Sequence, residues 1–221
     1  MGNIINIFDL EVTADPAKDI VRRIADNLEK ERIYTVELVT LEPVLQEKDN
    51  QLWKKQMQSM DLLIPGGKGV LGAEKNKYKA LEKEIENYVL HRFLMRFLQK
   101  NRKTVYLIAS SEENLIAFED AIKSFGQMIR IVGKSVIQEN GADKDKIINE
   151  INGLEPDCVF SALPSPLQEN FIYENKGLLN TRVWVGYGLR ILEYKSQGKL
   201  TNKIRLFILK KILHYHLEKQ A

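Results

Sequence analysis

A polar pair, Gln168 and Glu169, follows a loop with two prolines at the end of a predicted strand. Residues 157–162 form a short apolar run, residues 167–179 have helical spacing, and residues 182–187 are rich in β-forming residues, which predicts a strand, a helix and a second strand. Ligands of open parallel sheets bind outside the carboxyl ends of the strands, so this amide and carboxylate are candidates for contact with a polar ligand. The alternative, which spacing alone favours, is a first-turn pair in which the helix dipole simply favours Glu169.

A threonine stands at the end of another predicted strand, residues 34–40, and Glu42 lies two positions beyond it. The hydroxyl of Thr40 could hydrogen-bond a ligand or cap the helix that follows. The position of Thr40 alone favours capping.

A glycine-rich turn, Gly66-Gly67-Lys68-Gly69, follows the predicted strand 61–65. Glycine permits positive φ and lets a ligand approach the backbone closely. The spacing matches neither the P-loop nor the dinucleotide-binding fingerprint. Gly67 and Gly69 are therefore candidates for ligand contact, with the class of ligand left undefined by the spacing.

Two serines, Ser110 and Ser111, follow the predicted strand 104–109. Ser110 and Glu113 predict a capping box at the start of a helix. A helix N-terminus at the end of a strand can also bind an anion, although the adjacent acidic residues Glu112 and Glu113 would oppose a phosphate. An anion site and a capped helix with water at its end both stay open here.

Strands and helices alternate along the chain, which predicts an α/β fold with a Rossmann-like parallel sheet flanked by helices. The 221 residues suit one domain. No linker is evident before Ser196, so we expect a domain at residues 1–198 and a separate basic helix at residues 199–221. Further strands are expected at 3–8 and 128–133, and further helices at 46–60, 74–101 and 143–151.

The net charge of +3 is unevenly distributed, because residues 199–221 hold six basic residues and one acidic residue. A nucleic-acid-binding domain should carry its positive charge over a folded face, so this distribution argues against that class. Residues 202–217 predict an amphipathic helix, which could bind an anionic membrane surface or dock on the body of the protein. Its apolar face carries Ile204, Ile208, Ile212 and Tyr215, and its basic face carries Lys203, Lys210, Lys211 and His214.

Cys158 is the only cysteine, so the chain cannot form an internal disulfide, as is typical of a cytoplasmic protein. The acidic start of the chain predicts no signal peptide, and no apolar run is long enough to predict a membrane-spanning helix. The three histidines, His91, His214 and His216, lie in predicted helices without a Cys or Asp partner at ligand spacing. We therefore expect no metal site.

Taken together, residues 159–169 and 185–188 resemble the Pro-x-Gln-Glu and Val-Gly-x-Gly segments of the WecG/TagA/CpsF glycosyltransferases. The resemblance covers roughly residues 3 to 199. It implies transfer of a hexose or N-acetylhexosamine from a nucleotide sugar to a lipid-linked saccharide acceptor, in cell-surface polysaccharide or teichoic-acid-type synthesis. It also implies a metal-independent reaction at the inner face of the membrane, with the protein in the cytoplasm as a peripheral membrane protein.

The resemblance also assigns roles to residues of this chain. Thr40 matches the family's Thr-Leu-Asn segment, whereas Glu42 stands where the family has asparagine. Gly66 stands where the family has the aspartate proposed as its catalytic base, so a displaced carboxylate, Glu42 or Glu193, is expected to serve instead. Residues implied in substrate binding are Gly67, Gly69, Ser110, Ser111, Gln168, Glu169, Gly186 and Gly188, with Thr40, Glu42 and Glu193 in catalysis.

Two functions from different classes follow. The first is an active hexosyltransferase, which family resemblance favours. The second is a catalytically inactive relative that binds or scaffolds another glycosyltransferase, which Gly66 favours. A dinucleotide oxidoreductase lacks its glycine fingerprint here.

Overall fold

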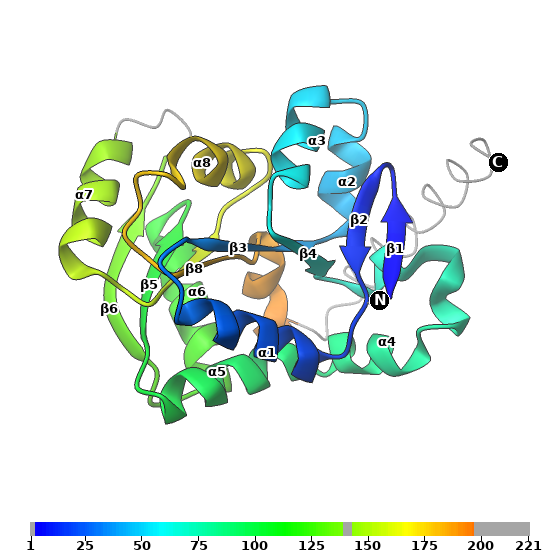
Figure 1. The fold of residues 1–221 in the computed structure, drawn as a ribbon, viewed down its shortest axis with the longest axis horizontal. Coiled ribbons are helices and arrows are strands. Elements are labelled where there is room, and N and C mark those ends of the chain that lie inside the picture. Colours follow the sequence, from blue (N-terminus) through cyan, green and yellow to red (C-terminus); the bar gives the residue numbers. More distant parts are fainter. Residues whose placement is uncertain (1–2, 139–142, 197–221) are drawn as a thin grey trace.

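Six parallel strands form the central sheet of this computed structural model, which describes residues 3–138 and 143–196 (Figure 1). Their order across the sheet is β4-β3-β8-β7-β5-β6, and every neighbouring pair is parallel. The predicted α/β fold with a parallel sheet is therefore confirmed. The strands are β3 (Tyr34–Val39), β4 (Leu62–Pro65), β5 (Thr104–Ala109), β6 (Arg130–Val136), β7 (Cys158–Ala162) and β8 (Val183–Gly186).

Helices cover both faces of the sheet, because side chains of a strand point alternately to either face. In β3, Val36 and Leu38 contribute to one hydrophobic core and Val39 to the other. The first core is closed by α1 (Ala17–Leu28), α5 (Val89–Lys100) and α6 (Glu112–Phe125), and the second by α2 (Leu41–Glu47), α3 (Gln51–Gln58), α7 (Lys144–Leu154) and α8 (Leu167–Asn175) (Figure 1).

The N-terminal strand does not join the sheet. β1 (Ile4–Ile7) forms an antiparallel hairpin with β2 (Leu10–Thr13), which the sequence pattern did not predict. The two-residue turn between these strands places Phe8 and Asp9 at positive φ, 48° and 69°, the conformation of a tight hairpin turn. Neither residue is glycine, so the usual sequence signal for this turn is missing.

Two predicted helices are each broken by local structure. The predicted helix 46–60 is wrong, since α2 ends at Glu47 and Asn50 caps α3 by accepting from the backbone N–H groups of Leu52 and Trp53 at 3.1 and 3.2 Å. The predicted helix 74–101 is replaced by η1 (Lys68–Asn76), α4 (Lys79–Glu86) and α5.

The break before α5 lies at Tyr88, which has φ of 52°. Its ring is buried and stacks on Phe125, with ring centroids 5.6 Å apart, and meets Tyr194 edge-on at 4.8 Å. Packing of this aromatic ring into the core therefore overrides the helical propensity of the surrounding sequence.

Residues 199–221, including the predicted amphipathic helix 202–217, lie outside the described residues. Within the described part of the chain, no helix is both long and apolar enough to cross a membrane.

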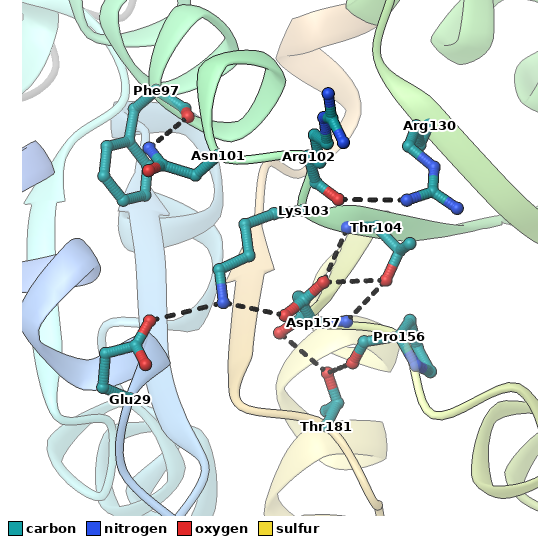
Figure 2. Close-up of polar contacts among 10 residues, drawn as sticks. All are labelled: Glu29, Phe97, Asn101, Arg102, Lys103, Thr104, Arg130, Pro156, Asp157 and Thr181. Carbon is teal, nitrogen blue, oxygen red and sulfur yellow. Dashed lines mark hydrogen bonds and ion pairs between the residues drawn. The ribbon is translucent and has the colours of Figure 1, made fainter.

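A reciprocal threonine–aspartate clamp joins the amino ends of β5 and β7 (Figure 2). The backbone N–H and hydroxyl of Thr104 donate to Asp157 Oδ2 at 2.7 and 2.9 Å, and the Asp157 N–H donates back to the hydroxyl at 3.0 Å. Lys103 Nζ lies 3.2 Å from Asp157 Oδ1. Burial opposes ionisation of Asp157, but the hydrogen bonds from Thr104 and Lys103 outweigh it and hold the pKa of this carboxyl below its usual value.

The same clamp occurs between β3 and β4. Both the N–H and the hydroxyl of Thr35 donate to Asp61 Oδ2 at 2.9 Å, and the Asp61 N–H donates to the hydroxyl at 3.0 Å. The strands of two pairs are thus fixed to each other at their amino ends. This constraint does not act on their carboxyl ends.

We expect Thr104→Val to lower the free energy of unfolding by about 1 kcal/mol, because it leaves the partly buried partners of the hydroxyl unsatisfied. Thr104→Ser keeps the hydroxyl and serves as the control. Because the pKa of Asp157 is depressed, stabilisation by its carboxylate is present above its unfolded pKa, about 3.9, and is lost as the pH falls through the folded pKa. Urea unfolding as a function of pH should show the deficit of Thr104→Val shrinking in acid, and a deficit that persists would contradict this account.

Candidate active site

A cavity of about 300 Å³ lies at the carboxyl ends of β3, β8 and β7. The segments that follow these strands diverge: α2 and α8 pack on one face of the sheet, whereas η2 (Leu189–Ser196) contributes Ile191 to the core on the other. Such divergence opens a crevice above the strand ends. This strand-end cavity brings together six of the predicted site residues, Thr40, Glu42, Gln168, Glu169, Gly188 and Glu193.

The Gln168 side chain is buried and links three neighbouring segments. Its Oε1 accepts from the Ser161 hydroxyl at 2.9 Å and from the backbone N–H groups of Gly188 at 3.2 Å and Leu163 at 3.4 Å. Its Nε2 donates to Glu37 Oε1. Because three donors surround Oε1, the amide has only one satisfied orientation, with Nε2 toward Glu37.

Glu169 has a separate set of contacts. Its Oε1 accepts from the Ser165 hydroxyl at 2.9 Å, and Ser165 Oγ in turn accepts from Trp53 Nε1 at 2.9 Å. Burial raises the pKa of Glu169, and the hydrogen bonds that it accepts only partly offset this effect. Both Gln168 and Glu169 lie in the first turn of α8, whose N-cap residue Pro166 makes no side-chain capping bond.

Glu37 is a site residue that the sequence analysis missed. It lies inside β3, is 3 % exposed, and lines the strand-end cavity. Burial raises the pKa of its carboxyl well above the usual value, the nearby Glu169 raises it further, and the hydrogen bond from Gln168 opposes the shift. An acidic residue within the apolar run Val36–Val39 was the available sequence signal.

The predicted cap at Thr40 is not formed. Thr40 occupies the N-cap position of α2 with extended backbone angles, but its side chain makes no capping hydrogen bond. It borders the strand-end cavity instead, so its hydroxyl is available to a ligand there.

The remaining predicted site residues do not line the strand-end cavity. A Cβ on Gly67 would lie 3.0 Å from the guanidinium of Arg190, and one on Gly69 would lie 3.1 Å from the Leu41 side chain. A Cβ on Gly186 would collide with Glu37 Oε2. Gly186 therefore makes room for the buried carboxyl of Glu37.

The two serines at the end of β5 also lie away from the cavity. The predicted capping box is wrong by one residue: Ser111 is the cap of α6, and its hydroxyl accepts from the Asn114 N–H at 3.1 Å. Ser110 Oγ accepts from Asn114 Nδ2 at 2.8 Å. Both hydroxyls are therefore engaged within the start of α6.

Gly66 faces a different, smaller cavity of about 40 Å³, which Arg190 and His91 also line. The φ angle of Gly66 is not positive, but a Cβ there would lie 2.9 Å from the carbonyl oxygen of Leu38. Close approach of the β3 backbone, rather than a left-handed conformation, is what requires glycine. Burial and the neighbouring Arg190 lower the pKa of His91 to about 3, so its imidazole is neutral at physiological pH.

Charge in the strand-end cavity is mostly acidic. Glu37 and Glu169 lie in its buried part, and Glu42 and Glu193 are partly exposed. Among the described residues, Arg190 is the single basic residue of its lining. The raised pKa values of the two buried carboxyls favour their neutral forms, which reduces repulsion of an anionic ligand. No group of three or more His, Cys, Asp or Glu side chains within residues 3–138 and 143–196 is placed to hold a metal ion.

Residues 5–192 match the Glycosyl transferase WecG/TagA/CpsF family. The chain belongs to this family. The match includes every residue named in the strand-end cavity except Glu193, so the cavity is part of the family's shared domain.

Two relatives from bacilli are both N-acetylglucosaminyldiphosphoundecaprenol N-acetyl-beta-D-mannosaminyltransferases. The Bacillus spizizenii protein is 28% identical over 155 residues, which is 68% of this chain and 59% of the relative. The Bacillus subtilis protein is 27% identical over 134 residues, which is 60% of this chain and 51% of the relative. The matched region thus spans between half and three fifths of these relatives.

We expect Gly66→Asp to destabilise the protein by about 1–3 kcal/mol rather than to restore a catalytic base, because the added Cβ crowds the backbone of Leu38. Gly66→Ala should cost a similar amount, since Cβ alone makes the contact. Gly177→Asp adds the same side chain where no atom lies within 4 Å of the new Cβ and is the matched control. Thermal melts test this expectation, and a stable Gly66→Asp protein with raised transferase activity would contradict it.

Proposed function

We propose that this protein transfers a hexose or N-acetylhexosamine from a nucleotide sugar to a lipid-linked saccharide acceptor during synthesis of a cell-surface polysaccharide. The observation that carries the proposal is the convergence of three family-like segments on one cavity. Thr40, the Gln168-Glu169 pair and Gly188 are far apart in the sequence, yet all border the strand-end cavity. The family's activity and the relatives' lipid-linked N-acetylglucosaminyl acceptor support this substrate class.

Within this proposal, Arg190 balances the charge of the donor's diphosphate, and Thr40 hydrogen-bonds the sugar or the phosphate. Glu42 or Glu193 accepts the proton from the acceptor hydroxyl, because both carboxylates line the cavity and are partly exposed. General-base catalysis contributes about 10²–10⁴-fold to a rate. Comparing Glu42→Gln with Glu193→Gln in one assay identifies which carboxylate has this role.

The assay combines purified full-length protein, UDP-N-acetylmannosamine or UDP-N-acetylglucosamine, and an N-acetylglucosaminyl-diphospho-lipid, with mass spectrometry of the lipid product. Calorimetric binding of each nucleotide sugar is measured in parallel. Turnover establishes the transferase. Binding without turnover would favour the second candidate, a non-catalytic subunit of another glycosyltransferase, for which the observation is Gly66 at the family's proposed base position. Absence of both would overturn the transferase.

We expect Thr40→Val to lower turnover or donor affinity about tenfold, because it removes a hydroxyl that borders the cavity and makes no capping bond. Its melting temperature should stay close to that of the wild type, and Thr40→Ser should retain function. This variant is a cleaner probe than Gln168→Ala, which would leave three donors unsatisfied, two of them buried, and destabilise the fold. An unchanged Thr40→Val enzyme would argue against this placement of the substrate.

We further propose that residues 202–217 bring the protein to the inner face of the membrane, where a lipid-linked acceptor would lie. The support is the sequence alone: an apolar face bordered by lysines, each of which contributes about 1 kcal/mol near an anionic surface.

Co-sedimentation with vesicles of phosphatidylglycerol and phosphatidylcholine should pellet the full chain more than a chain that ends at Gly198. High salt should reduce this difference, because the lysine contribution is electrostatic. Vesicles of phosphatidylcholine alone are the control. Equal pelleting of the two chains would leave the segment as a contact for the body or for another protein.

A further inference from the structure

A row of basic side chains covers the outer face of α5. Residues 87–103 include five basic residues and no acidic residue. The helix packs its apolar stripe into the first core, which leaves Arg92, Arg96 and Lys100 exposed. Because these three residues are spaced four apart, they lie together on one side of the helix.

Within the described part of the chain, no ion pair neutralises this row: Arg92, Arg96 and Lys100 pair with no described carboxylate. On the neighbouring α1, by contrast, Arg22 lies 3.5 Å from Asp19. Like charges four residues apart destabilise a helix, and a cation near the helix start, such as Arg92, also opposes the helix dipole. The row is therefore unfavourable for the protein alone, and its charge is available to a partner.

Two further arginines extend the row beyond the end of α5. Arg102 follows the helix by two residues, and Arg130 Nη1 donates to the carbonyl oxygen of Arg102 at 3.3 Å (Figure 2). Both arginines are exposed. An aromatic residue, Phe93, stands beside Arg92 and is 39 % exposed. We call this set the basic patch, and its members are Arg92, Phe93, Arg96, Lys100, Arg102 and Arg130.

The combination of cations and an exposed aromatic ring fits the chemistry of an anionic membrane surface. Basic side chains bind the headgroup phosphates there, and an apolar side chain enters the boundary with the acyl chains. An exposed apolar residue needs no explanation by itself, but Phe93 stands among cations that lack an internal partner. A nucleic acid or a soluble anion would use the cations and leave the ring in water, so Phe93 favours the membrane.

From these observations we propose that the basic patch docks the protein on an anionic phospholipid surface, with Phe93 at the boundary of the acyl chains. The inference deepens the proposed function, on which the choice of partner rests, because a lipid-linked acceptor lies in a membrane. It concerns a different surface from residues 202–217. Since α5 covers the face of the sheet opposite α3 and α7, the proposal also states which face meets the membrane (Figure 1).

The direct test places a fluorophore in the basic patch of the full chain. The two tryptophans, Trp53 and Trp184, are buried, so Phe93→Trp adds an exposed indole against a buried background. We expect its emission to shift to the blue with vesicles of equal parts phosphatidylglycerol and phosphatidylcholine, and not with phosphatidylcholine alone. Leu178→Trp, at a position that is 62 % exposed and outside the patch, is the control and should not shift. No shift in Phe93→Trp, or an equal shift in both variants, would overturn the proposal.

Co-sedimentation with the same vesicles tests the contribution of charge. The double variant Arg92→Gln with Arg96→Gln should bind about tenfold more weakly than the wild type, because both cations lie at the proposed surface. The matched control, Lys55→Gln with Lys146→Gln, removes the same charge from exposed positions on α3 and α7 and should stay within about twofold of the wild type. An equal loss in the two double variants would show that only net charge matters, and unchanged binding of the first would exclude the patch.

The same variants distinguish docking from a structural role and from the proposed function. Loss of Arg92 and Arg96 relieves like-charge repulsion, so the melting temperature should not fall, and a marked fall would assign these residues to stability. Vesicle binding through the patch without any turnover would leave this inference standing while the transferase fails. Retention of the protein on duplex DNA, with no emission shift of Phe93→Trp on vesicles, would assign the patch to nucleic acid and overturn the membrane contact.

Discussion

The amide of Gln168 is the interaction on which the candidate site depends. Its side-chain oxygen accepts hydrogen bonds from the Ser161 hydroxyl of β7 and from the backbone N–H groups of Leu163 and Gly188. Its side-chain nitrogen donates to Glu37 of β3, and β8 lies between β3 and β7 in the sheet. Because these contacts use both ends of the amide, the side chain cannot rotate without leaving buried donors unpaired. The relative positions of three strand ends, and of the Glu37 carboxyl, are therefore coupled to a single residue.

The electrostatics of the cavity follow from this burial. The described residues contribute four carboxyl groups and one arginine to the lining, and these would repel a nucleotide diphosphate if every carboxyl were ionised. The sheet and its covering helices exclude water from Glu37 and Glu169, and desolvation disfavours their charged forms. The fold thus reduces the negative charge of a site whose residue types alone suggest an anion-repelling surface.

Polar groups at the amino ends and at the carboxyl ends of the strands differ in their hydrogen-bond partners. Clamps between Thr35 and Asp61 and between Thr104 and Asp157 satisfy the polar groups at the amino edge with residues of the chain itself. At the carboxyl edge, the Thr40 side chain makes no capping bond and Glu37 Oε2 has no partner within the described residues. Unsatisfied polar groups at one edge are tolerated because the other edge and the two apolar cores stabilise the fold.

The sequence by itself determined the α/β class and the parallel sheet, because strands and helices that alternate in hydrophobic period permit few other architectures. The family followed from the resemblance of residues 159–169 and 185–188 to its segments. It also identified Gln168, Glu169, Thr40 and Gly188 as residues at strand ends. Only the tertiary structure decided which of these segments meet, since strand order is not encoded in local pattern, and β8 lies between β7 and β3. For the same reason the sequence missed Glu37: its place in the site depends on the hydrogen bond from Gln168, on Gly186 in the neighbouring strand, and on the Glu169 carboxyl of α8, none of which is near it in the chain.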